Sequence, residues 1–358
     1  MLACVRAAPG TARPMRFDGA YVDWPFLPPR TSLGSTHWPL SAPPFSPALR
    51  TSAPSSPNLR RPCSSHTPSM ARVTVALAVR NGEATLAKAL EAVFAQTWTD
   101  FDVLVLDDGS TDATAEIAAR YPLRLIRQEN TGLGGGRKRL TEEATGEWIA
   151  FFDHDDFWTQ DKMAIQARFM DDPETVLIHA DGWYVYEDGR EVSRDWQPEG
   201  SRSWDHILPS NRVIASTAVY RREAMLQAGN FVADTVRCSD WYGWFLIASR
   251  GRFVHVPQKL VRYSVLSTSL ANAGYRFHAA QAYLLEKHIL PCWNELSPDL
   301  SVGERNRYRT MVRRNLGVAL AAMARQGEGP ERKALALRAL RTAPDVLRVW
   351  SRSLSALK

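Results

Sequence analysis

Two apolar runs in this chain end abruptly in carboxylates, and this feature constrains the fold more than any other. Val103–Leu106 is followed by Asp107 and Asp108, and Trp148–Phe152 is followed by the run Asp153–Asp156. Buried strands of a parallel sheet are nearly continuous apolar runs, and open α/β sheets bind ligands at the carboxyl edge of their strands. We therefore expect the two acidic clusters to lie together at one edge of a parallel sheet.

The second acidic cluster has the alternation expected at a strand end. Successive side chains point to opposite faces of a strand, so Asp153 and Asp155 share a side, whereas His154 points the other way and is not expected to be a ligand. Carboxylates gathered at one edge repel each other unless a cation joins them. Oxygen ligands suit Mg²⁺ or Mn²⁺ that bridges to phosphates. The pattern therefore predicts a metal–nucleotide site.

The segment from Met70 onward alternates between strand and helix patterns. Repeated strand–helix units predict an α/β fold with a mostly parallel central sheet and right-handed crossovers. The half from about 175 to 290 is richer in Trp and less regular, with a hairpin expected at Asp188-Gly189. The predicted strands are residues 73–79, 101–106, 123–127, 148–152 and 176–180; the predicted helices are 84–96, 112–120, one that follows a Gly-rich loop at 132–136 and ends at 144, and one after 161.

The first 69 residues differ from the rest in composition. Residues 1–69 hold 13 of the 22 prolines, with seven Arg and two Asp, so they cannot bury enough apolar surface to offset their ordering entropy and are predicted to be disordered. An Arg-rich, acid-poor composition permits a transit-peptide interpretation. We favour an upstream start codon instead, because Met70 directly precedes the first predicted strand. The sequence leaves open whether residues 1–69 are translated.

The last part of the chain, residues 291–358, is predicted to be helical and to begin after a break at Pro291. Residues 305–325 and 331–357 have amphipathic patterns, separated by the stretch from Gly327 to Pro330. Such helices could pack on the core, pair with a partner, or lie on a membrane.

The net charge is unevenly distributed along the chain. Residues 301–358 carry +9 and residues 1–69 carry +5, which leaves −8 for residues 70–300. An acidic middle makes nucleic acid a poor partner, whereas a basic tail suits anionic lipid headgroups, so we expect peripheral membrane contact through the C-terminal helices. The alternative is that these charges are solvated faces of packed helices.

Cysteine usage and hydropathy limit the cellular compartments in which the protein is expected. The four cysteines form no CxxC pair, which argues against a zinc ribbon or a disulfide scaffold and fits a reducing compartment. No apolar stretch approaches the roughly 18 residues needed to span a bilayer. The N-terminus lacks the apolar region of a signal peptide. We therefore expect a cytoplasmic protein, soluble or peripheral to the inner face of the plasma membrane.

Six short stretches between Val73 and Met163 carry a family resemblance through their order and spacing. In this arrangement they resemble glycosyltransferase family 2, the inverting GT-A transferases that use nucleotide-diphospho-sugars, and a weaker match continues through Ser239-Asp240-Trp241 to about Leu270. The six stretches are Val79-Arg80-Asn81-Gly82-Glu83, Ala95-Gln96-Thr97, Asp107-Asp108-Gly109-Ser110-Thr111-Asp112, Gln128-Glu129-Asn130-Thr131-Gly132, Gly146-Glu147-Trp148-Ile149-Ala150 and Asp153-His154-Asp155-Asp156.

The resemblance implies a nucleotide site at the ends of the first two strands. The backbone after Val79, with Asn81 and Glu83, would line the base and ribose, and Asp108 would accept the imide N–H of uracil. The alternative for Asp108 is a role as a helix cap or turn residue. Ser110 and Asp112 are the residues from which that role is expected.

The glycine run would approach the donor closely at Gly135, and Arg137 would lie near the diphosphate. The run follows the third strand and has the wrong spacing for a dinucleotide fingerprint. Lys138 stands where the family often has Asn, which could add another positive charge near phosphate.

The acidic run would bind the metal and the ribose. In the family arrangement Asp155 would ligate Mg²⁺ or Mn²⁺, and Asp153 would contact ribose or metal-bound water. Asp156 is expected to be a helix-entry residue that supports the loop.

Asp240 is the proposed catalytic base, because inverting transfer requires one carboxylate to take the proton of the acceptor hydroxyl. Ser239 replaces the Glu that is common before it, and Asp234 is the competing candidate. The nearby aromatic residues Trp241, Tyr242 and Trp244 offer stacking faces for a sugar, and one or two of them are expected to be core.

The tail motif after Tyr263 departs from the family pattern. Arg and His usually follow this Tyr, but here Ser264, Val265 and Leu266 follow, which puts donor-phosphate contacts from this loop in doubt. Ser267 and Ser269 are expected to compensate weakly.

The whole pattern predicts an inverting glycosyltransferase with a GT-A-like domain over residues 70–290 and a basic helical tail over 291–358. It would move a sugar from a nucleotide-diphospho-sugar, with UDP favoured over GDP and dTDP, to a hydroxyl of a cell-envelope polysaccharide or glycolipid. Two alternatives are a non-catalytic nucleotide- or glycan-binding relative and a phosphatase of the haloacid-dehalogenase type that uses the DxD run. The donor sugar, acceptor, linkage and oligomeric state are not encoded in any motif.

Overall fold

The computed structural model describes residues 71–196, 200–235, 237–266, 274–327 and 329–357. The predicted disordered extension, residues 1–69, lies outside this part of the chain, as do Ser267 and Ser269.

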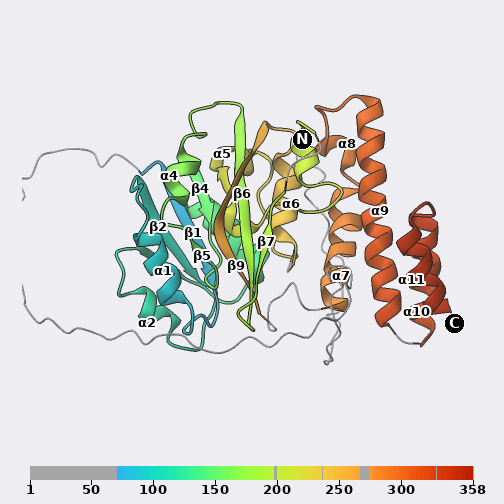
Figure 1. Cartoon of the computed structure of the whole chain (residues 1–358), viewed down its shortest axis with the longest axis horizontal. Helices are drawn as coiled ribbons and strands as arrows, with labels where there is room; N and C mark the ends of the chain where they lie inside the picture. The colour runs from blue at the N-terminus through green and yellow to red at the C-terminus, as the bar shows by residue number, and fades with distance from the viewer. Residues whose placement is uncertain (1–70, 197–199, 236, 267–273, 328, 358) are drawn as a thin grey trace, which may run out of the picture. The chain divides into compact units, whose positions relative to one another are not determined.

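The first half of the sheet is parallel, as predicted. Its strands pair in the order β3-β2-β1-β4, and β1 is flanked by β2 and β4 in parallel registers (Figure 1). The strands are β1 Val73–Val79, β2 Phe101–Asp107, β3 Arg124–Arg127 and β4 Trp148–Phe151.

The second half of the sheet is mixed. Strand β8 pairs antiparallel with β4 and with β6, β9 runs parallel to β6, and β5 and β7 pair antiparallel with β9 and β6. The α/β class with a GT-A-like sheet is confirmed, although the predicted mostly parallel pairing holds for the first half only. The strands are β5 Phe157–Trp158, β6 Thr175–Tyr186, β7 Glu191–Arg194, β8 Val219–Arg221 and β9 Arg252–Val265.

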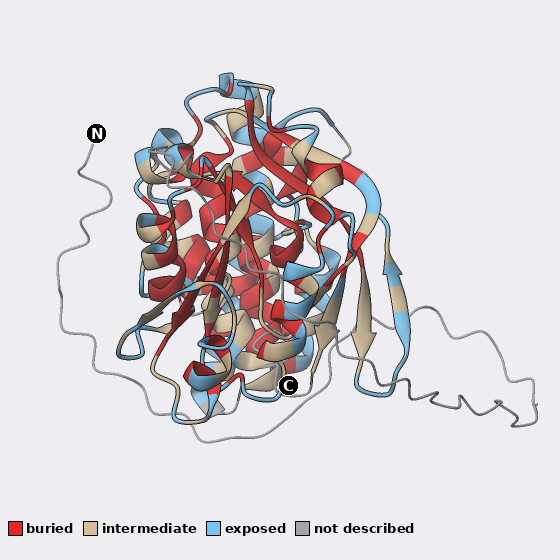
Figure 2. Ribbon diagram, turned by 90° about the vertical axis from the view of Figure 1, so that its left-hand side faces the viewer, coloured by how far each residue is buried: buried red, intermediate tan, exposed pale blue. Residues whose placement is uncertain are grey.

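Hydrophobic cores lie on both faces of the sheet. Alternate residues of β1 point to opposite faces, so Val75 and Leu77 pack in the core that contains Leu90 of α1, whereas Ala76 packs in the core that contains Leu140 of α3. In Figure 2 the central strands are buried, whereas the outer end of β6 and strand β7 are partly exposed. The hairpin predicted at Asp188-Gly189 joins these two strands.

Helices flank this sheet and extend beyond it. They are α1 Leu86–Phe94, α2 Thr114–Ala118, α3 Gly132–Glu143, α4 Lys162–Ala167, α5 Arg222–Gln227, α6 Ser239–Ile247, α7 Tyr275–Tyr283 with the π-helical η4 Leu284–Ile289, α8 Trp293–Leu296, α9 Val302–Gln326, α10 Gly329–Thr342 and α11 Leu347–Leu357, with short 3₁₀ turns η1 Ser203–His206 and η2 Ala215–Thr217.

The prediction of a glycine loop before α3 was wrong, because the glycines form the first turns of the helix itself. A Cβ on Gly134 would lie 2.3 Å from the carbonyl oxygen of Val232, and one on Gly135 would lie 2.5 Å from Oγ1 of Thr131. Close packing therefore requires glycine here and overrides its poor helix propensity.

The C-terminal region is helical, as predicted, but it is divided differently. The predicted helix over 331–357 is two helices, because Pro344 lies between α10 and α11 and cannot continue a helix. This region packs on the rest of the fold: the hydroxyl of Tyr308 in α9 donates to Asp205 in η1 at 2.7 Å. Among the residues that the structure describes, no helix is long and apolar enough to cross a membrane.

Candidate functional site

Arg137 joins three parts of the chain that are far apart in sequence. Its Nη2 lies 3.5 Å from Oδ1 of Asp153 and its Nη1 lies 3.7 Å from Oδ1 of Asp240, while Nη1 also donates to Oγ of Ser239 at 2.9 Å. The Arg137 side chain is only 5% exposed, and its guanidinium lies over the ring of Phe151. Helix α3, the end of β4 and the start of α6 thus meet at one buried cation.

Asp240 is held in a defined position at the start of α6. Its Oδ2 accepts a 2.7 Å hydrogen bond from Nδ2 of Asn211, and its place in the first turn of the helix favours a carboxylate. The side chain remains 19% exposed, so it is reachable from solvent.

The competing carboxylate, Asp234, lies in a different environment. It accepts a 3.0 Å hydrogen bond from the hydroxyl of Tyr283 in α7 and lies 3.3 Å from Nε2 of His288 in η4. The structure therefore brings Asp240, and not Asp234, to Arg137 and Asp153.

The acidic run after β4 is partly buried, and its charges repel one another. Burial raises the pKa of the Asp155 carboxyl, the neighbouring charge of Asp153 raises it further, and His154 opposes this. His154 itself contacts Oγ1 of Thr85 at 2.8 Å through Nδ1.

Asp156 supports the loop, although not at a helix entry as predicted, because strand β5 follows it. Its buried carboxylate accepts hydrogen bonds from Oγ of Ser216 and from the backbone N–H of Ser264, the latter at 2.8 Å. Ser216 Oγ also accepts from the backbone N–H of Asp153 at 3.1 Å, and Ser264 Oγ donates to the carbonyl of Asp155. The loop is thereby fixed to η2 and β9, so its acids cannot move apart freely.

This donor set suits a cation that is shared with a phosphate. No group of three His, Cys, Asp or Glu side chains within the described ranges could hold a metal ion by itself. Mg²⁺ and Mn²⁺ at phosphate sites commonly use one or two carboxylates, with phosphate and water as the other ligands. Asp155 and Asp153 fit that requirement, and a cation would relieve their mutual repulsion.

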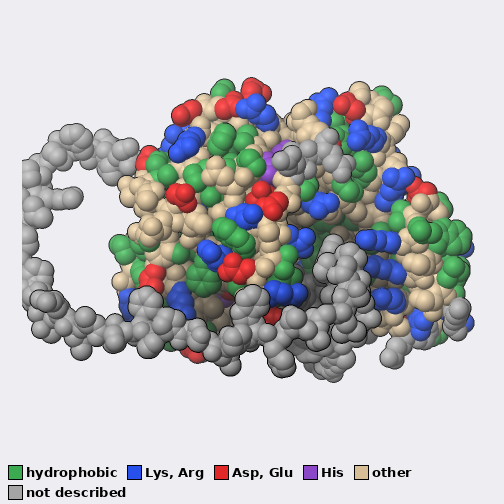
Figure 3. All heavy atoms as spheres, in the orientation of Figure 1, with side chains coloured by type: hydrophobic (Ala, Val, Ile, Leu, Met, Phe, Trp, Pro, Cys, Tyr) green, Lys and Arg blue, Asp and Glu red, His purple; other side chains and the backbone are tan. Residues whose placement is uncertain are grey.

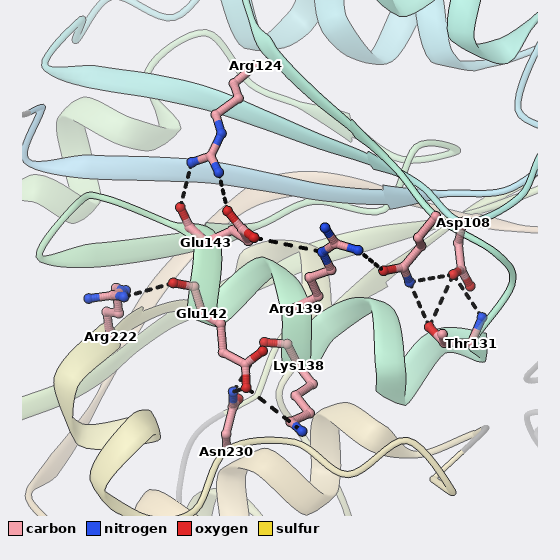
Figure 4. Close-up of polar contacts among 10 residues, drawn as sticks. Asp108, Arg124, Thr131, Lys138, Arg139, Glu142, Glu143, Arg222 and Asn230 are labelled. Atoms are coloured by element: carbon pink, nitrogen blue, oxygen red, sulfur yellow. Dashed lines mark hydrogen bonds and ion pairs between the residues drawn. The ribbon is translucent and has the colours of Figure 1, made fainter.

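Asp108 caps helix α3. Its buried carboxylate accepts hydrogen bonds from Nε2 of Gln128 at 2.7 Å, from the backbone N–H of Thr131 at 2.9 Å and from that of Gly132 at 3.0 Å, and Thr131 also donates through its hydroxyl (Figure 4). The structure thus shows the capping role that sequence analysis gave as the alternative. Contact with uracil stays a prediction.

Asn81 and Glu83 bind a neighbouring loop. Oδ1 of Asn81 accepts from the backbone N–H of Thr111 at 2.9 Å, and Oε2 of Glu83 accepts from that of Ala113 at 3.2 Å. Asn81 has a φ of 54°, a conformation that asparagine tolerates better than most residues. With buried Val79 at the end of β1, they lie at the same sheet edge as the capping carboxylate, and their contact with a nucleotide stays a prediction.

Lys138 does not join the cation at the centre of the site. Its Nζ lies 3.9 Å from Oε1 of Glu142 one turn along α3, and Figure 4 shows the pair beside Asn230. The expectation of a second positive charge near phosphate therefore has no support from this side chain.

All three aromatic residues after Asp240 belong to the core. Trp241, Tyr242 and Trp244 are buried, and the indole N–H of Trp241 donates to the carbonyl of Ile207 at 3.0 Å. The rest of the fold covers these three side chains, so none of them offers a stacking face for a sugar.

Two tyrosines lie near the acidic run: Tyr263, which sequence analysis named only in the tail motif, and Tyr184, which it missed. The rings of Tyr184 in β6 and Tyr263 in β9 lie 5.2 Å apart. Burial raises the pKa of Tyr263 well above its usual value, and the nearby charges of Asp156 and Asp153 raise it further. Burial also raises the pKa of Tyr184, with Asp156 and Asp240 among the contributing charges. Tyr263 precedes Ser264, which binds Asp155 and Asp156, so the pair of rings lies beside the acidic run. The aromatic run in β6 was the only sequence signal for Tyr184.

Comparisons with known proteins agree on one family and one fold. Residues 74–227 match the family model described as glycosyl transferase family 2. The uncharacterized protein Rv1520 of Mycobacterium tuberculosis is 30% identical over 241 residues, which cover 63% of this chain and 68% of that protein. An Escherichia coli protein named UDP-Glc:alpha-D-GlcNAc-diphosphoundecaprenol beta-1,3-glucosyltransferase WfaP is 25% identical over 214 residues, which cover 59% of this chain and 79% of that protein.

Solved structures share the fold at low sequence identity. The crystal structure of S. aureus TarS 1-349 has a TM-score of 0.55 and 18% identity, and covers 80% of this chain and 89% of that one. Asp240 lies beyond the segment that matches the family model, so its place in the site rests on the contacts described above.

Proposed function

This chain belongs to glycosyl transferase family 2 and is a glycosyltransferase that uses a nucleotide-sugar donor, and we propose that it transfers the sugar with inversion to a hydroxyl of a cell-envelope polysaccharide or glycolipid. The carrying observation is the contact of one buried guanidinium, that of Arg137, with both Asp153 and Asp240. We also propose that residues 70–290 form the transferase domain and that residues 291–358 form its helical tail.

Asp240 is the proposed base of a single displacement. As the acceptor oxygen forms its bond to the anomeric carbon, Asp240 takes the hydroxyl proton, the bond from that carbon to the diphosphate breaks, and the nucleoside diphosphate leaves with the bonding electrons. Asn211 and Arg137 fix the direction of the Asp240 carboxylate, which supports this role.

The donor end of the site is proposed to lie at Asp155 and Asp153. These two carboxylates would hold Mg²⁺ or Mn²⁺, which supplies charge stabilisation for the departing diphosphate. Arg137 would add a fixed positive charge beside them.

We propose UDP as the nucleotide. Oδ2 of Asp108 accepts one protein hydrogen bond, from Gly132, and a carboxylate oxygen has a second lone pair that the imide N–H of uracil could use. The name of the E. coli relative, which specifies UDP-Glc, supports the same choice.

The test combines donor binding and turnover on the full chain. Thermal unfolding is measured with UDP, GDP, dTDP or CMP, each with and without Mn²⁺. A ligand at about 100 times its dissociation constant should stabilise by about 2.7 kcal/mol. We expect a Mn²⁺-dependent shift with UDP that Asp155→Ala abolishes.

Turnover separates an enzyme from a nucleotide-binding relative. We expect release of UDP from UDP-sugars in a panel with glycan acceptors, and its loss in Asp240→Asn but not in Asp234→Asn. Binding of UDP without donor consumption would favour the non-catalytic alternative, and the absence of any nucleotide shift would contradict the proposed donor site.

A further inference from the structure

One residue at the site, Ser239, has no role in the transfer described above. It is fully buried at the start of α6, and its Oγ accepts a 2.9 Å hydrogen bond from Nη1 of Arg137. The same nitrogen lies 3.7 Å from Oδ1 of Asp240, a separation that is too long for a hydrogen bond. Ser239 thus holds the cation close to the proposed base while no hydrogen bond joins the two.

The two carboxylate oxygens of Asp240 are in different environments. Its Oδ2 accepts a 2.7 Å hydrogen bond from Nδ2 of Asn211. Oδ1 of Asn211 accepts from the backbone N–H of Val213 at 3.2 Å, which fixes the amide with its NH₂ group toward Asp240. Among the residues that the structure describes, none donates a hydrogen bond to Oδ1 of Asp240. Oδ2 is therefore the oxygen that orients the carboxylate, and Oδ1 is the one with lone pairs available for a proton.

The hydroxyl of Ser239 decides where the Arg137 guanidinium donates. Arg137 is only 5% exposed, so its N–H groups need acceptors within the protein. Without the Ser239 oxygen, Nη1 could regain an acceptor by closing on Oδ1 of Asp240. A hydrogen bond from a guanidinium stabilises an ionised carboxylate and so makes it a weaker base. Because serine is neutral, it holds the cation without adding another carboxylate beside Asp153 and Asp240.

We propose that Ser239 is a positioning residue, which holds Arg137 away from Oδ1 of Asp240 so that this oxygen can take the proton of the acceptor. The inference rests on the proposed function. In the single displacement, the proton of the acceptor hydroxyl moves to Oδ1, the acceptor oxygen bonds to the anomeric carbon, and the nucleoside diphosphate leaves with the electrons of the broken bond. Ser239 is fully buried and acts only through Arg137.

Few other charges lie near Asp240. Asp153 lies on the far side of the Arg137 guanidinium, 3.5 Å from its Nη2. Burial raises the pKa of Cys238 and that of Tyr184, and the Asp240 charge adds to both shifts, so neither group is charged below neutral pH. Figure 3 shows Lys and Arg side chains on the surface over α9, where solvent and salt screen them. Arg137 is therefore the cation that is expected to act on Asp240.

The experiment measures kcat against pH for the full chain and its Ser239→Ala variant, with the UDP-sugar and glycan acceptor of the turnover panel at saturation and Mn²⁺ present. We expect the plateau of kcat to fall about three- to tenfold in the variant, because a weaker base takes the proton less readily. The acid limb of the profile should move to lower pH, because a carboxylate that binds a guanidinium stays ionised in more acid solution. The donor KM should change less than kcat, because Asp155 is unaltered.

Further variants separate positioning from a merely structural role. Ser239→Cys keeps the volume, but a thiol is a weak acceptor, so it should act in the same direction even if the alanine variant does not fold. In an Arg137→Gln background, Ser239→Ala should no longer move the acid limb, and the two losses of kcat should not add. The matched control is Ser297→Ala, which removes another buried hydroxyl, one that donates to the carbonyl of Trp293, and should keep the wild-type profile. Thermal unfolding shows whether each variant is folded.

Several results would overturn the inference. A folded Ser239→Ala or Ser239→Cys enzyme with the wild-type kcat and acid limb contradicts it, as does a limb that moves to higher pH or an equal shift in the Arg137→Gln background. In these cases the wild type still turns over, so the proposed transfer stands. If the wild type releases no nucleoside diphosphate, or if Asp240→Asn keeps its turnover, the proposed function or its base is wrong, and the inference falls with it.

Discussion

The two sides of the sheet edge use their carboxylates differently. On the side built from β1, β2 and α3, Asp108, Asn81 and Glu83 accept hydrogen bonds from backbone N–H groups and hold loops in place. On the side built from β4 and α6, Asp153 and Asp240 share a single guanidinium and remain partly exposed. The first side is a rigid frame, and the second keeps charge available for a substrate.

The largest effect is expected at Asp240, a partly exposed carboxylate on the second side. Asp240→Asn preserves the size of the side chain but removes the proposed base, so turnover should fall about 10²–10⁴-fold with little change in the free energy of unfolding. Steady-state release of nucleoside diphosphate measures the first quantity and urea unfolding the second. Asp234→Asn is the control, and an equal loss of turnover in that variant would contradict the assignment.

The opposite result is expected at Asp108. Asp108→Ala removes the acceptor of the Thr131 backbone N–H and one of the two acceptors of Gln128 Nε2 and of the Gly132 N–H, all part-buried, which should lower the free energy of unfolding by about 1–2 kcal/mol. Denaturant unfolding provides the measurement, with Asp108→Asn as the milder variant. Because Asp108 is also proposed to bind uracil, UDP binding should weaken too. A variant that has lost UDP binding at unchanged stability would break the comparison, since Asp108 would then serve the nucleotide without holding α3.

The close packing around the glycines at the start of α3 gives a second test of the rigid side. A Cβ on Gly134 would meet the carbonyl of Val232 at 2.3 Å, so Gly134→Ala should cost about 1–3 kcal/mol of folding free energy. Gly303 in the first turn of α9 has open space, and Gly303→Ala should instead add about 0.5–1 kcal/mol. Urea unfolding measures both changes in free energy. If they are similar, the start of α3 can accommodate a methyl group that its contacts indicate it cannot.

These two sides also differ in how well the sequence predicts them. Strand β1 has the predicted bounds Val73–Val79, because a buried parallel strand is a continuous apolar run. The glycine turn of α3 was missed because its cause is a contact with Val232, which lies about a hundred residues away. Likewise, an apolar run such as Trp241–Trp244 looks the same whether it stacks on a sugar or fills a core, so local pattern could not separate the two.

The sequence predicted which residues belong to the site but not which of them contact one another. Motif order identified Arg137, Asp153 and Asp240 as candidates, yet nothing in the sequence indicated that one guanidinium would contact both carboxylates. Asn211 and Tyr184 come from segments without a motif, and they reach the site only because β6 and the loop before η2 fold back to it. Long-range contacts of this kind depend on the whole sheet order.

The effect that is smallest at neutral pH concerns a buried histidine cluster in the mixed half of the sheet, away from the motif residues. His179 Nε2 and His206 Nδ1 share a 2.8 Å hydrogen bond, and the ring of His255 lies 5.0 Å from that of His179. Burial lowers the pKa of His206 to about 4, with the charge of His255 acting in the same direction and Asp205 opposing it.

Because the unfolded chain protonates His206 near 6.5 and the folded protein only near 4, the unfolded state binds more protons between these values. Stability should therefore be complete above about pH 6.5 and should decrease as the pH falls toward 4, by on the order of 3 kcal/mol. Urea midpoints across this range measure the slope, and His206→Asn should reduce it. If the slope is unchanged in that variant, the acid sensitivity does not come from His206.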